Sequence, residues 1–487
     1  MAGTMQISVS EVAQHCSPSD CWVVINGDVW DLSKFAPKHP GGCDAILRYA
    51  GQDASQAYNE VHAPDLISRV LTANELVGQL DRSSLDTQWH NSSVRQAAPR
   101  PALKPPLSTI LSARDFEIVA QDTFSKKAWT FYSSGATDLL SLKANRVLYD
   151  RIWFRPRLLR NVRDVSTKCT VQGVECSLPV IVAPVALAQL ANPIGEEAIA
   201  KAAASRGIFH CVPITASSPV EDVISGVPYP ATVFFFQLYV AKNRTVSESL
   251  LRRVWDLGIR TLFVTIDAPV AGKREADEKV KAQGMIAMPM TGTRSREDGA
   301  GSGLTRTTGS FIDSSLCWDD LTWLKVQWPG KLVIKGIQSV EDAQIAAEAG
   351  VSGIVLSNHG GRNLDTSPPG LLTLLELQRH LPSIFSQVEV YVDGGVRRGT
   401  DILKALCLGA KAVLVGRPFL YSLAYGEKGP QHLFDIFQAE LETAMRLVGI
   451  TDLSQAHPAF VNTNDLDHLV VKDVRAHASH ITPHAKI

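Results

Sequence analysis

Eight short apolar segments recur between residues 179 and 416, and helical stretches separate them. The segments are 179–183, 208–212, 232–238, 261–267, 331–335, 353–357, 388–393 and 412–416. The intervening amphipathic stretches include 195–205, 245–255, 340–349, 371–380 and 400–408. Strand–helix units repeated in this way predict an α/β protein with a closed (β/α)8 TIM barrel, and a doubly wound sheet is the alternative.

Polar and charged residues directly follow six of the predicted strands. Such barrels build their active sites at the carboxyl ends of the strands, so these side chains are expected at one end of the barrel. They are Gln237, Tyr239, Thr265, Asp267, Lys335, His359, Arg362, the run from Asp393 to Arg397, Gly416 and Arg417. The polar stretch 271–310 follows the fourth strand without an apolar period, which predicts a lid or a disordered loop.

The strand-end residues suit flavin chemistry. Glycine N–H groups beside arginines after the seventh and eighth strands favour a bound phosphate, and therefore a phosphorylated cofactor. Lys335 supplies a cation for the negative charge on a reduced flavin. His359 and Arg362 stand three residues apart, which suits a general base and a carboxylate-binding fork. Asp267 is placed to orient the imidazole.

The N-terminal residues 5–81 have alternating segments and many turn residues, which predict a small α+β domain. His39 lies in an H-P-G-G turn, and His62 follows in a second turn. Two imidazoles can fill both axial positions of a haem iron, which favours electron transfer over oxygen binding. The alternative is that each is an ordinary surface histidine.

The remaining segments set the boundaries and the setting of the two domains. Residues 82–109 are rich in Pro, Ser, Gln and Asn and predict a linker, which leaves 110–465 for the barrel and 466–487 as a tail. A formal charge of -1 argues against a nucleic-acid partner, and there is no apolar run long enough to span a membrane. Eight scattered cysteines and no visible transit peptide favour an intracellular soluble protein, in the cytoplasm rather than the mitochondrial intermembrane space or the peroxisome.

The N-terminal domain resembles the cytochrome b5 family. Residues 22–32, W-V-V-I-N-G-D-V-W-D-L, and Phe35 precede the H-P-G-G turn as they do in that family. The resemblance implies that His39 and His62 are the axial ligands of haem b.

The barrel resembles the FMN-dependent 2-hydroxy acid oxidases and dehydrogenases, whose active-site signature is similar to residues 357–365, S-N-H-G-G-R-N-L-D. The resemblance implies His359 as the base, Asp267 as its partner, and substrate contacts from Tyr239, Arg362, Arg274 and position 131. The implied FMN contacts are Ala183, Pro184, Val185, Ala186, Gln237, Thr265, Lys335, Asp393, Gly394, Gly395, Val396, Arg397, Gly416 and Arg417. With the haem domain in front, the chain is similar to the flavocytochrome b2 family of cytochrome-linked L-lactate dehydrogenases.

The chain departs from the family pattern in three places. Phe131 stands where the family has a tyrosine that reaches the substrate carboxylate and, in the haem-linked members, a haem propionate. The loop 212–219 is shorter than the family's loop, so its FMN-contacting serine is not assigned. Asn363 replaces the usual glutamine.

The resemblance implies oxidation of a small L-2-hydroxy acid, such as lactate, by removal of its α-hydrogen to FMN. Electrons would then pass singly to haem b and on to a cytochrome c-like acceptor. One alternative is an oxidase that passes electrons to oxygen, and another is a redox-binding protein that has lost catalysis. The resemblance also implies a homo-oligomer, which is a tetramer in the family.

Overall fold

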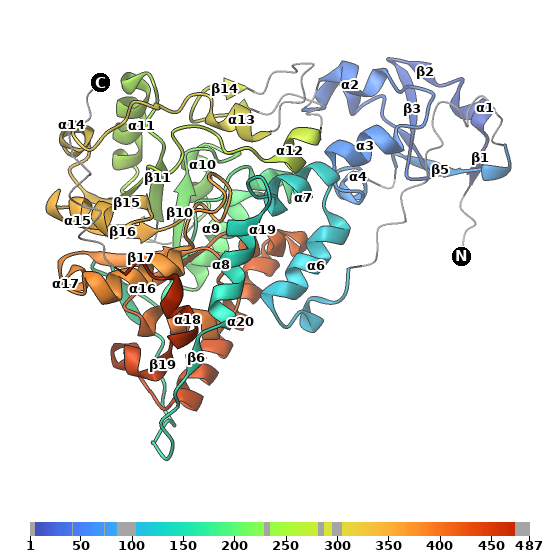
Figure 1. Ribbon diagram of the computed structural model, residues 1–487. Coiled ribbons are helices and arrows are strands. Elements are labelled where there is room, and N and C mark those ends of the chain that lie inside the picture. The colour runs from blue at the N-terminus through green and yellow to red at the C-terminus, as the bar shows by residue number, and fades with distance from the viewer. Residues whose placement is uncertain are drawn as a thin grey trace.

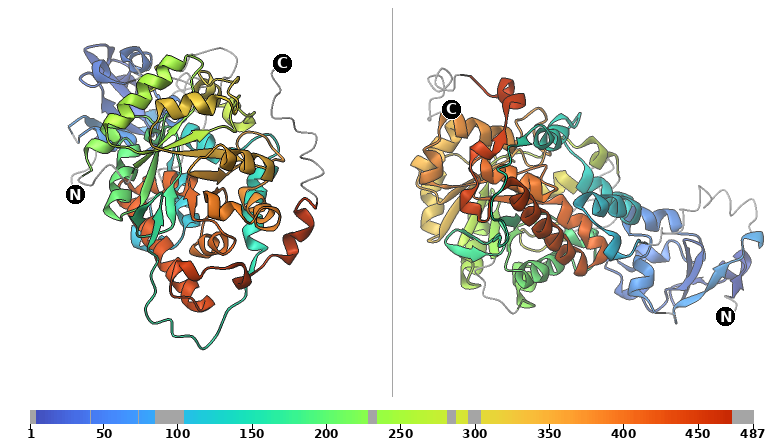
Figure 2. Two further views of the ribbon diagram at one scale, coloured as in Figure 1. Left: turned by 90° about the vertical axis from the view of Figure 1, so that its left-hand side faces the viewer. Right: turned by 90° about the horizontal axis from the view of Figure 1, so that it is seen from below.

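The computed structural model describes residues 5–40, 42–72, 74–84, 104–227, 234–280, 287–294 and 304–472. It has two parts that lie side by side, a small N-terminal domain and a larger barrel (Figure 1). Seen from below, the N-terminal domain extends from one side of the barrel (Figure 2). Most of the predicted linker and residues 473–487 of the predicted tail lie outside the described residues.

The larger part is a closed barrel of eight parallel strands, which confirms the predicted fold and rules out the doubly wound sheet. The last strand pairs with the first, so the sheet has no free edge. In barrel order the strands are β9 (Val180–Val182), β10 (Phe209–Pro213), β11 (Phe234–Leu238), β12 (Thr261–Thr265), β15 (Lys331–Ile337), β16 (Gly353–Leu356), β17 (Glu389–Asp393) and β18 (Ala412–Val415). Residues 232 and 233 of the predicted third strand lie outside the described residues.

Helices surround the barrel because their apolar faces need the outer side of the sheet. The five predicted helical stretches correspond to α9 (Glu196–Ser205), α11 (Arg244–Asp256), α15 (Val340–Glu348), α16 (Gly370–His380) and α18 (Gly399–Cys407). Capping side chains stabilise the amino ends of two of these helices. Asn243 caps α11 by accepting from the Thr245 N–H, and Ser339 caps α15 by accepting from the Asp342 N–H.

Side chains fill the interior of the barrel, so it is not a channel. Phe209, Phe235 and Phe263 stack on one another, with ring centroids 4.6 and 5.2 Å apart. A hairpin of β7 (Cys169–Val171) and β8 (Val174–Cys176) adds to the same apolar cluster and covers the amino-terminal end. A ligand therefore has access only at the carboxyl ends of the strands.

The N-terminal domain is a five-stranded sheet with short helices, as the α+β prediction required. The sheet has the order β1 (Gln6–Ile7), β5 (Leu76–Leu80), β4 (Asp28–Asp31), β3 (Asp20–Ile25) and β2 (Cys16–Ser17). Its α-helices are α1 (Val9–Val12), α2 (Cys43–Leu47), α3 (Ser55–Val61) and α4 (Leu66–Val70). The domain meets the barrel where α3 lies beside α7 (Lys126–Ser133), as Figure 1 shows.

A lysine also ties the two parts together. The Lys104 ammonium lies 3.2 Å from the Asp65 carboxylate of the N-terminal domain and donates to the Ala424 carbonyl of the barrel at 2.7 Å.

The predicted lid contains four short elements in its described parts. They are α12 (Glu275–Lys279), β13 (Ala287–Met288), β14 (Thr293–Arg294) and α13 (Leu304–Gly309), and residues 281–286 and 295–303 lie outside the described residues. Within the described part of the chain, no helix combines the length and apolar character that crossing a membrane requires.

Candidate active site

A histidine and an aspartate form a hydrogen-bonded pair at the open end of the barrel. Asp267 lies just beyond β12, and His359 follows β16 with a left-handed backbone, φ 57°. The His359 Nδ1–H donates to Asp267 Oδ1 at 2.8 Å, because a carboxylate can only accept. Nε2 therefore carries the lone pair, and it lies 3.2 Å from the Tyr239 hydroxyl.

Burial and charge act in opposite directions on this pair. Burial lowers the pKa of His359 below its usual value, and Asp267 only partly opposes this. Burial would raise the pKa of Asp267, but His359 and Lys335 outweigh it and hold that pKa below the usual range. At neutral pH the site thus holds an ionised carboxylate behind a neutral imidazole, as a general base requires.

Lys335 places a buried cation on the floor of the same site. Its ammonium lies 3.1 Å from Asp393 Oδ2 and donates to the Ser357 hydroxyl at 3.0 Å. Burial opposes the charge, but Asp393 and Asp267 raise the pKa of Lys335 above its usual value, so the ammonium persists. Ser357 also accepts from the His359 backbone N–H at 3.0 Å, which connects the lysine to the base.

The buried Arg274 and the half-buried Arg362 and Arg417 converge beside the base. The Arg362 Nη1 donates to the carbonyls of Phe131 and Tyr132 at 2.9 and 3.0 Å, which lie in the last turn of α7. The Arg274 Nε donates to the Arg362 carbonyl at 3.0 Å. Burial and the charges of Arg274 and Arg417 lower the pKa of Arg362. Guanidinium groups placed this close together repel one another, and an anion such as a carboxylate bound beside them relieves the repulsion.

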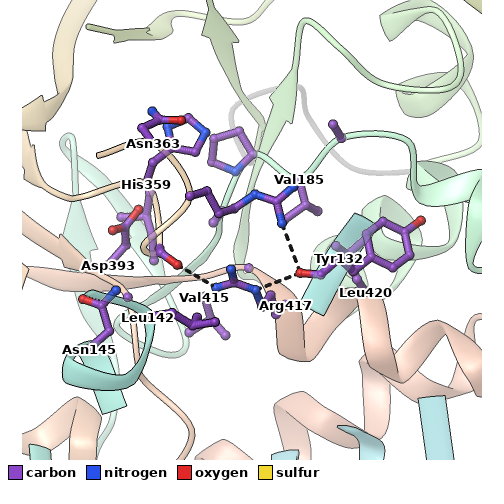
Figure 3. Close-up of a pocket in the computed structure, with 18 of the residues that line it drawn as sticks. Tyr132, Leu142, Asn145, Val185, His359, Asn363, Asp393, Val415, Arg417 and Leu420 are labelled. Carbon is purple, nitrogen blue, oxygen red and sulfur yellow. Dashed lines mark hydrogen bonds between the residues drawn. The ribbon is translucent and has the colours of Figure 1, made fainter. Parts of the chain in front are cut away.

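One cavity collects all fourteen residues predicted to bind FMN, together with Phe131, Tyr239, Arg274, His359 and Arg362. Figure 3 shows Arg417 reaching toward Tyr132, with His359 and Asp393 on the opposite side. Gly394 and Gly395 both have φ 86°, and a β-carbon on Gly395 would run into the Asn145 carbonyl. Only glycine therefore fits at this position.

The arginines expected at the phosphate are engaged by the protein itself. Arg397 donates to the Glu117 carboxylate at 2.8 Å, and Glu117 also accepts from Arg146. Arg417 donates to three carbonyls, those of Tyr132, Ser134 and Gly360, at 2.9 to 3.0 Å. Arg417 thus holds the end of α7 to the His359 loop, and its role at a phosphate stays a prediction.

Two of the three departures from the family pattern, position 131 and the 212–219 loop, lie beside the flavin cavity. Phe131 is 3% exposed, and its ring centroid lies 5.2 Å from the Arg362 guanidinium carbon. In the shortened loop, Ser217 and Ser218 accept hydrogen bonds from Gln189 and so turn away from the cavity. Thr215 is the residue of this loop that lines the flavin cavity.

The two N-terminal histidines face each other across a separate cavity of about 880 Å³. Their ring centroids lie 6.0 Å apart, which leaves room for one metal ion at bonds of about 2 Å to each imidazole nitrogen. The His39 Nδ1–H donates to the Gly42 carbonyl at 3.1 Å, so Nε2 is the nitrogen left to ligate. Burial and His39 lower the pKa of His62 to about 4, which keeps that imidazole neutral. The pair fits a haem iron.

Comparison with known proteins gives the family. The model of the FMN-dependent dehydrogenase family matches residues 120–463. The L-lactate dehydrogenase (cytochrome) of Saccharomyces cerevisiae is 39% identical over 476 residues, which cover 95% of this chain and 80% of that protein. The chain belongs to the FMN-dependent dehydrogenase family.

Other matches extend the family assignment to both domains. The model of the cytochrome b5-like haem- and steroid-binding domain matches residues 8–81. A solved flavin-binding domain of baker's yeast flavocytochrome b2 is 38% identical, with a TM-score of 0.68 over 78% of this chain and 93% of its own. A peroxisomal (S)-2-hydroxy-acid oxidase of Oryza sativa subsp. japonica is 39% identical but covers only 72% of this chain. This FMN-dependent dehydrogenase thus carries a haem domain, and its cofactors are FMN and haem b.

The residues lining the flavin cavity fit FMN. Asp393 Oδ1 is buried without a hydrogen-bond partner in the described part of the chain, so a ligand hydroxyl can satisfy it. Gly394 and Gly395 line the same cavity, and Lys335 supplies the cation.

Sequence reasoning missed several residues that organise the site. Ser357, which joins Lys335 to His359, lies inside the signature but was not singled out. Thr305 lies in the predicted lid and accepts from Arg274 Nη1 at 2.9 Å. Glu117 and Arg146 belong to no motif, and only their position against Arg397 reveals them.

Proposed function

We propose that this FMN-dependent dehydrogenase oxidises a small L-2-hydroxy acid, with lactate as the first candidate, to the 2-oxo acid. FMN accepts the electron pair from the substrate, and haem b passes the electrons singly to a cytochrome c-like acceptor. The observation that carries the proposal is the His359–Asp267 pair beside Arg274, Arg362 and Arg417.

His359 is the residue proposed to take the substrate proton. Since Nδ1 is held by Asp267, Nε2 accepts the proton, either from the hydroxyl or from the α-carbon. The ionised Asp267 stabilises the resulting imidazolium. The Tyr239 hydroxyl lies 3.2 Å from Nε2 and is placed to hold the substrate oxygen at the base.

Arg362 is proposed to bind the substrate carboxylate. Its Nη1 is committed to the two α7 carbonyls, so Nε and Nη2 are the donors that can form a two-pronged contact. Arg274 lies close enough to share the negative charge. We assign the family's FMN contacts to the fourteen cavity residues. His39 and His62 are the proposed axial ligands of haem b.

The oxidase alternative has support from the rice relative, but that match does not extend over the haem domain. Anaerobic stopped-flow mixing with a panel of 2-hydroxy acids, with flavin and haem absorbance recorded separately, tests the proposal. Flavin reduction followed by haem reduction is expected. Rapid peroxide formation in air without haem reduction would favour the oxidase, and flavin that stays oxidised with every acid would favour a protein without catalysis.

We further propose that residues 5–81 and 110–465 act as separate modules, joined by 82–109 and followed by a tail, 466–487. Because the two ligand sets lie in different modules, His62→Ala should remove or disturb the haem while FMN stays bound. Hydroxy acid oxidation with an artificial acceptor should remain largely intact. Absorbance spectra of the purified variant and steady-state assays measure both, and loss of the two cofactors together would contradict the modular proposal. The compartment, the final acceptor and the homo-oligomeric state stay predictions.

Phe131 is expected to make lactate a poor substrate. A tyrosine here would donate to a charged carboxylate, a bond worth about 1.5–3 kcal/mol, so Phe131→Tyr should strengthen engagement of small 2-hydroxy acids roughly 10- to 150-fold. We expect a lower KM for lactate and faster electron transfer from flavin to haem. Stopped-flow kinetics resolve the two steps. Unchanged values for both would show that position 131 touches neither the substrate nor the haem.

A further inference from the structure

Helix α7 connects the two cofactor cavities. Lys127 and Phe131 stand one turn apart on this helix, so they share one face. Phe131 lines the flavin cavity, whereas Lys127 lines the haem cavity together with His62. Lys127 belongs to the barrel and is only 3% exposed. A barrel residue therefore contributes a buried cation to the pocket of the neighbouring domain.

The haem cavity has an apolar end and a mixed end. Val23, Ile25 and Leu32 line the part that reaches into the core of the N-terminal domain. On the barrel side the wall combines apolar residues such as Leu187 with the polar residues Lys127, Gln189 and Asn192. A haem is apolar except for two carboxylates on one edge, so a haem whose apolar edge is buried in the core would have its carboxylates toward the barrel.

Lys127 differs from the other cations around this cavity. Lys38, Arg48 and Arg69 also line it, but all three are exposed to solvent. Burial lowers the pKa of Lys127 to about 8, and the charge of Asp277 only partly opposes this. Asp277 itself accepts two hydrogen bonds from Thr305, at 2.7 and 3.0 Å. An ammonium that lines the haem cavity is placed to bind a carboxylate of the group held there.

We propose that Lys127 binds a carboxylate of haem b across the domain boundary, and so fixes the haem domain on the barrel. Position 131 lacks the tyrosine hydroxyl of the family pattern. In its place, the Lys127 ammonium would bind the haem carboxylate from one turn earlier on the same helix. The inference rests on haem b as the bound group, and it does not depend on which hydroxy acid is the substrate.

The test compares two proteins with two haems in the full-length, FMN-loaded chain. Wild type and Lys127→Met are each loaded with haem b or with haem dimethyl ester, whose carboxylates are uncharged. Transfer of the haem to excess apomyoglobin gives the release rate. With haem b, release from Lys127→Met should be roughly 10- to 100-fold faster, since a hydrogen bond between charged groups is lost. With the ester, the two proteins should release at the same rate.

Matched variants separate this role from simple loss of charge or of folding. Lys126→Met removes an exposed lysine from the same turn and should leave release unchanged. Lys127→Arg keeps the charge and should retain most of the haem affinity. An equal effect of Lys127→Met with both haems would show that the lysine acts on the domain contact without a carboxylate, and would overturn the proposal. Wild-type release from Lys127→Met with haem b would overturn it as well. The rate of flavin reduction by lactate, measured in the same samples, tests the proposed function separately.

Discussion

His359→Gln is expected to slow flavin reduction by a 2-hydroxy acid about 10²- to 10⁴-fold, the usual contribution of a positioned base. Glutamine is close in size and keeps a polar end, but its amide cannot take the proton that Nε2 accepts. FMN should stay bound, because Lys335, Asp393 and the glycines of the cavity are untouched. Single-turnover stopped-flow measures the reduction rate, and the flavin content of the purified variant is the control. A wild-type rate would move the base to another residue.

The pH dependence of the wild-type protein tests the same assignment. A base acts only when it is deprotonated, and burial holds the pKa of His359 below its usual value. The kcat/KM for the hydroxy acid should therefore stay flat from neutral pH down to below about 6.5, and fall as the pH decreases further.

Asp267→Asn provides the matched variant for the pH profile. The Asp267 carboxylate raises the pKa of His359, so its loss should move the acid limb of the profile to still lower pH. The plateau should also fall, because the imidazolium loses its stabilising charge. An acid limb that does not move in Asp267→Asn would show that the limb reports a group other than His359.

Arg362→Met is expected to lower kcat/KM for a 2-hydroxy acid roughly 30- to 5,000-fold, since removing one partner of a buried charge pair costs about 2–5 kcal/mol. The structure adds a reason for a large effect. Arg362 fastens the end of α7 with Nη1 and still has Nε and Nη2 for the substrate, so one side chain performs two tasks.

Arg362→Lys, compared with Arg362→Met, separates the charge of the side chain from its hydrogen-bonding geometry. A lysine keeps the charge, but it cannot donate to both α7 carbonyls and also grip a carboxylate with two parallel bonds. KM should rise and kcat should fall together, as steady-state assays with lactate will measure. Flavin content and circular dichroism control for misfolding. If Arg362→Lys behaved like the wild type, the substrate carboxylate would lie elsewhere.

Much of the barrel could be predicted because its signals are local. Each strand is a short apolar run, polar or charged residues follow six of the eight, and a parallel barrel brings all the strand ends to one rim. Thr265, Lys335, His359 and Asp393 therefore had to come together once the eight strands closed. The haem domain could be predicted for the same reason. Its two histidines lie in turns, and the sequence signals around each of them are local.

Hydrogen bonds and ion pairs between residues that are far apart in the chain could not be predicted from these local signals. Glu117, for example, pairs with both Arg146 and Arg397, and no pattern in its own segment indicates this. The sequence left the FMN-contacting serine of the 212–219 loop unassigned, and only the structure shows that the hydroxyls of Ser217 and Ser218 accept from Gln189.

The sequence by itself determined the fold class and the residue types at the rim of the barrel, because these follow from apolar periodicity and strand-end composition, whereas FMN and haem b were implied by the resemblance to known families. Only the tertiary structure decided which His359 nitrogen is available, which carbonyls hold Arg362 and Arg417, and that Lys127 of one domain is buried in the pocket of the other. Hydrogen bonds and buried charges depend on neighbours that are remote in the chain, and packing alone selects those neighbours.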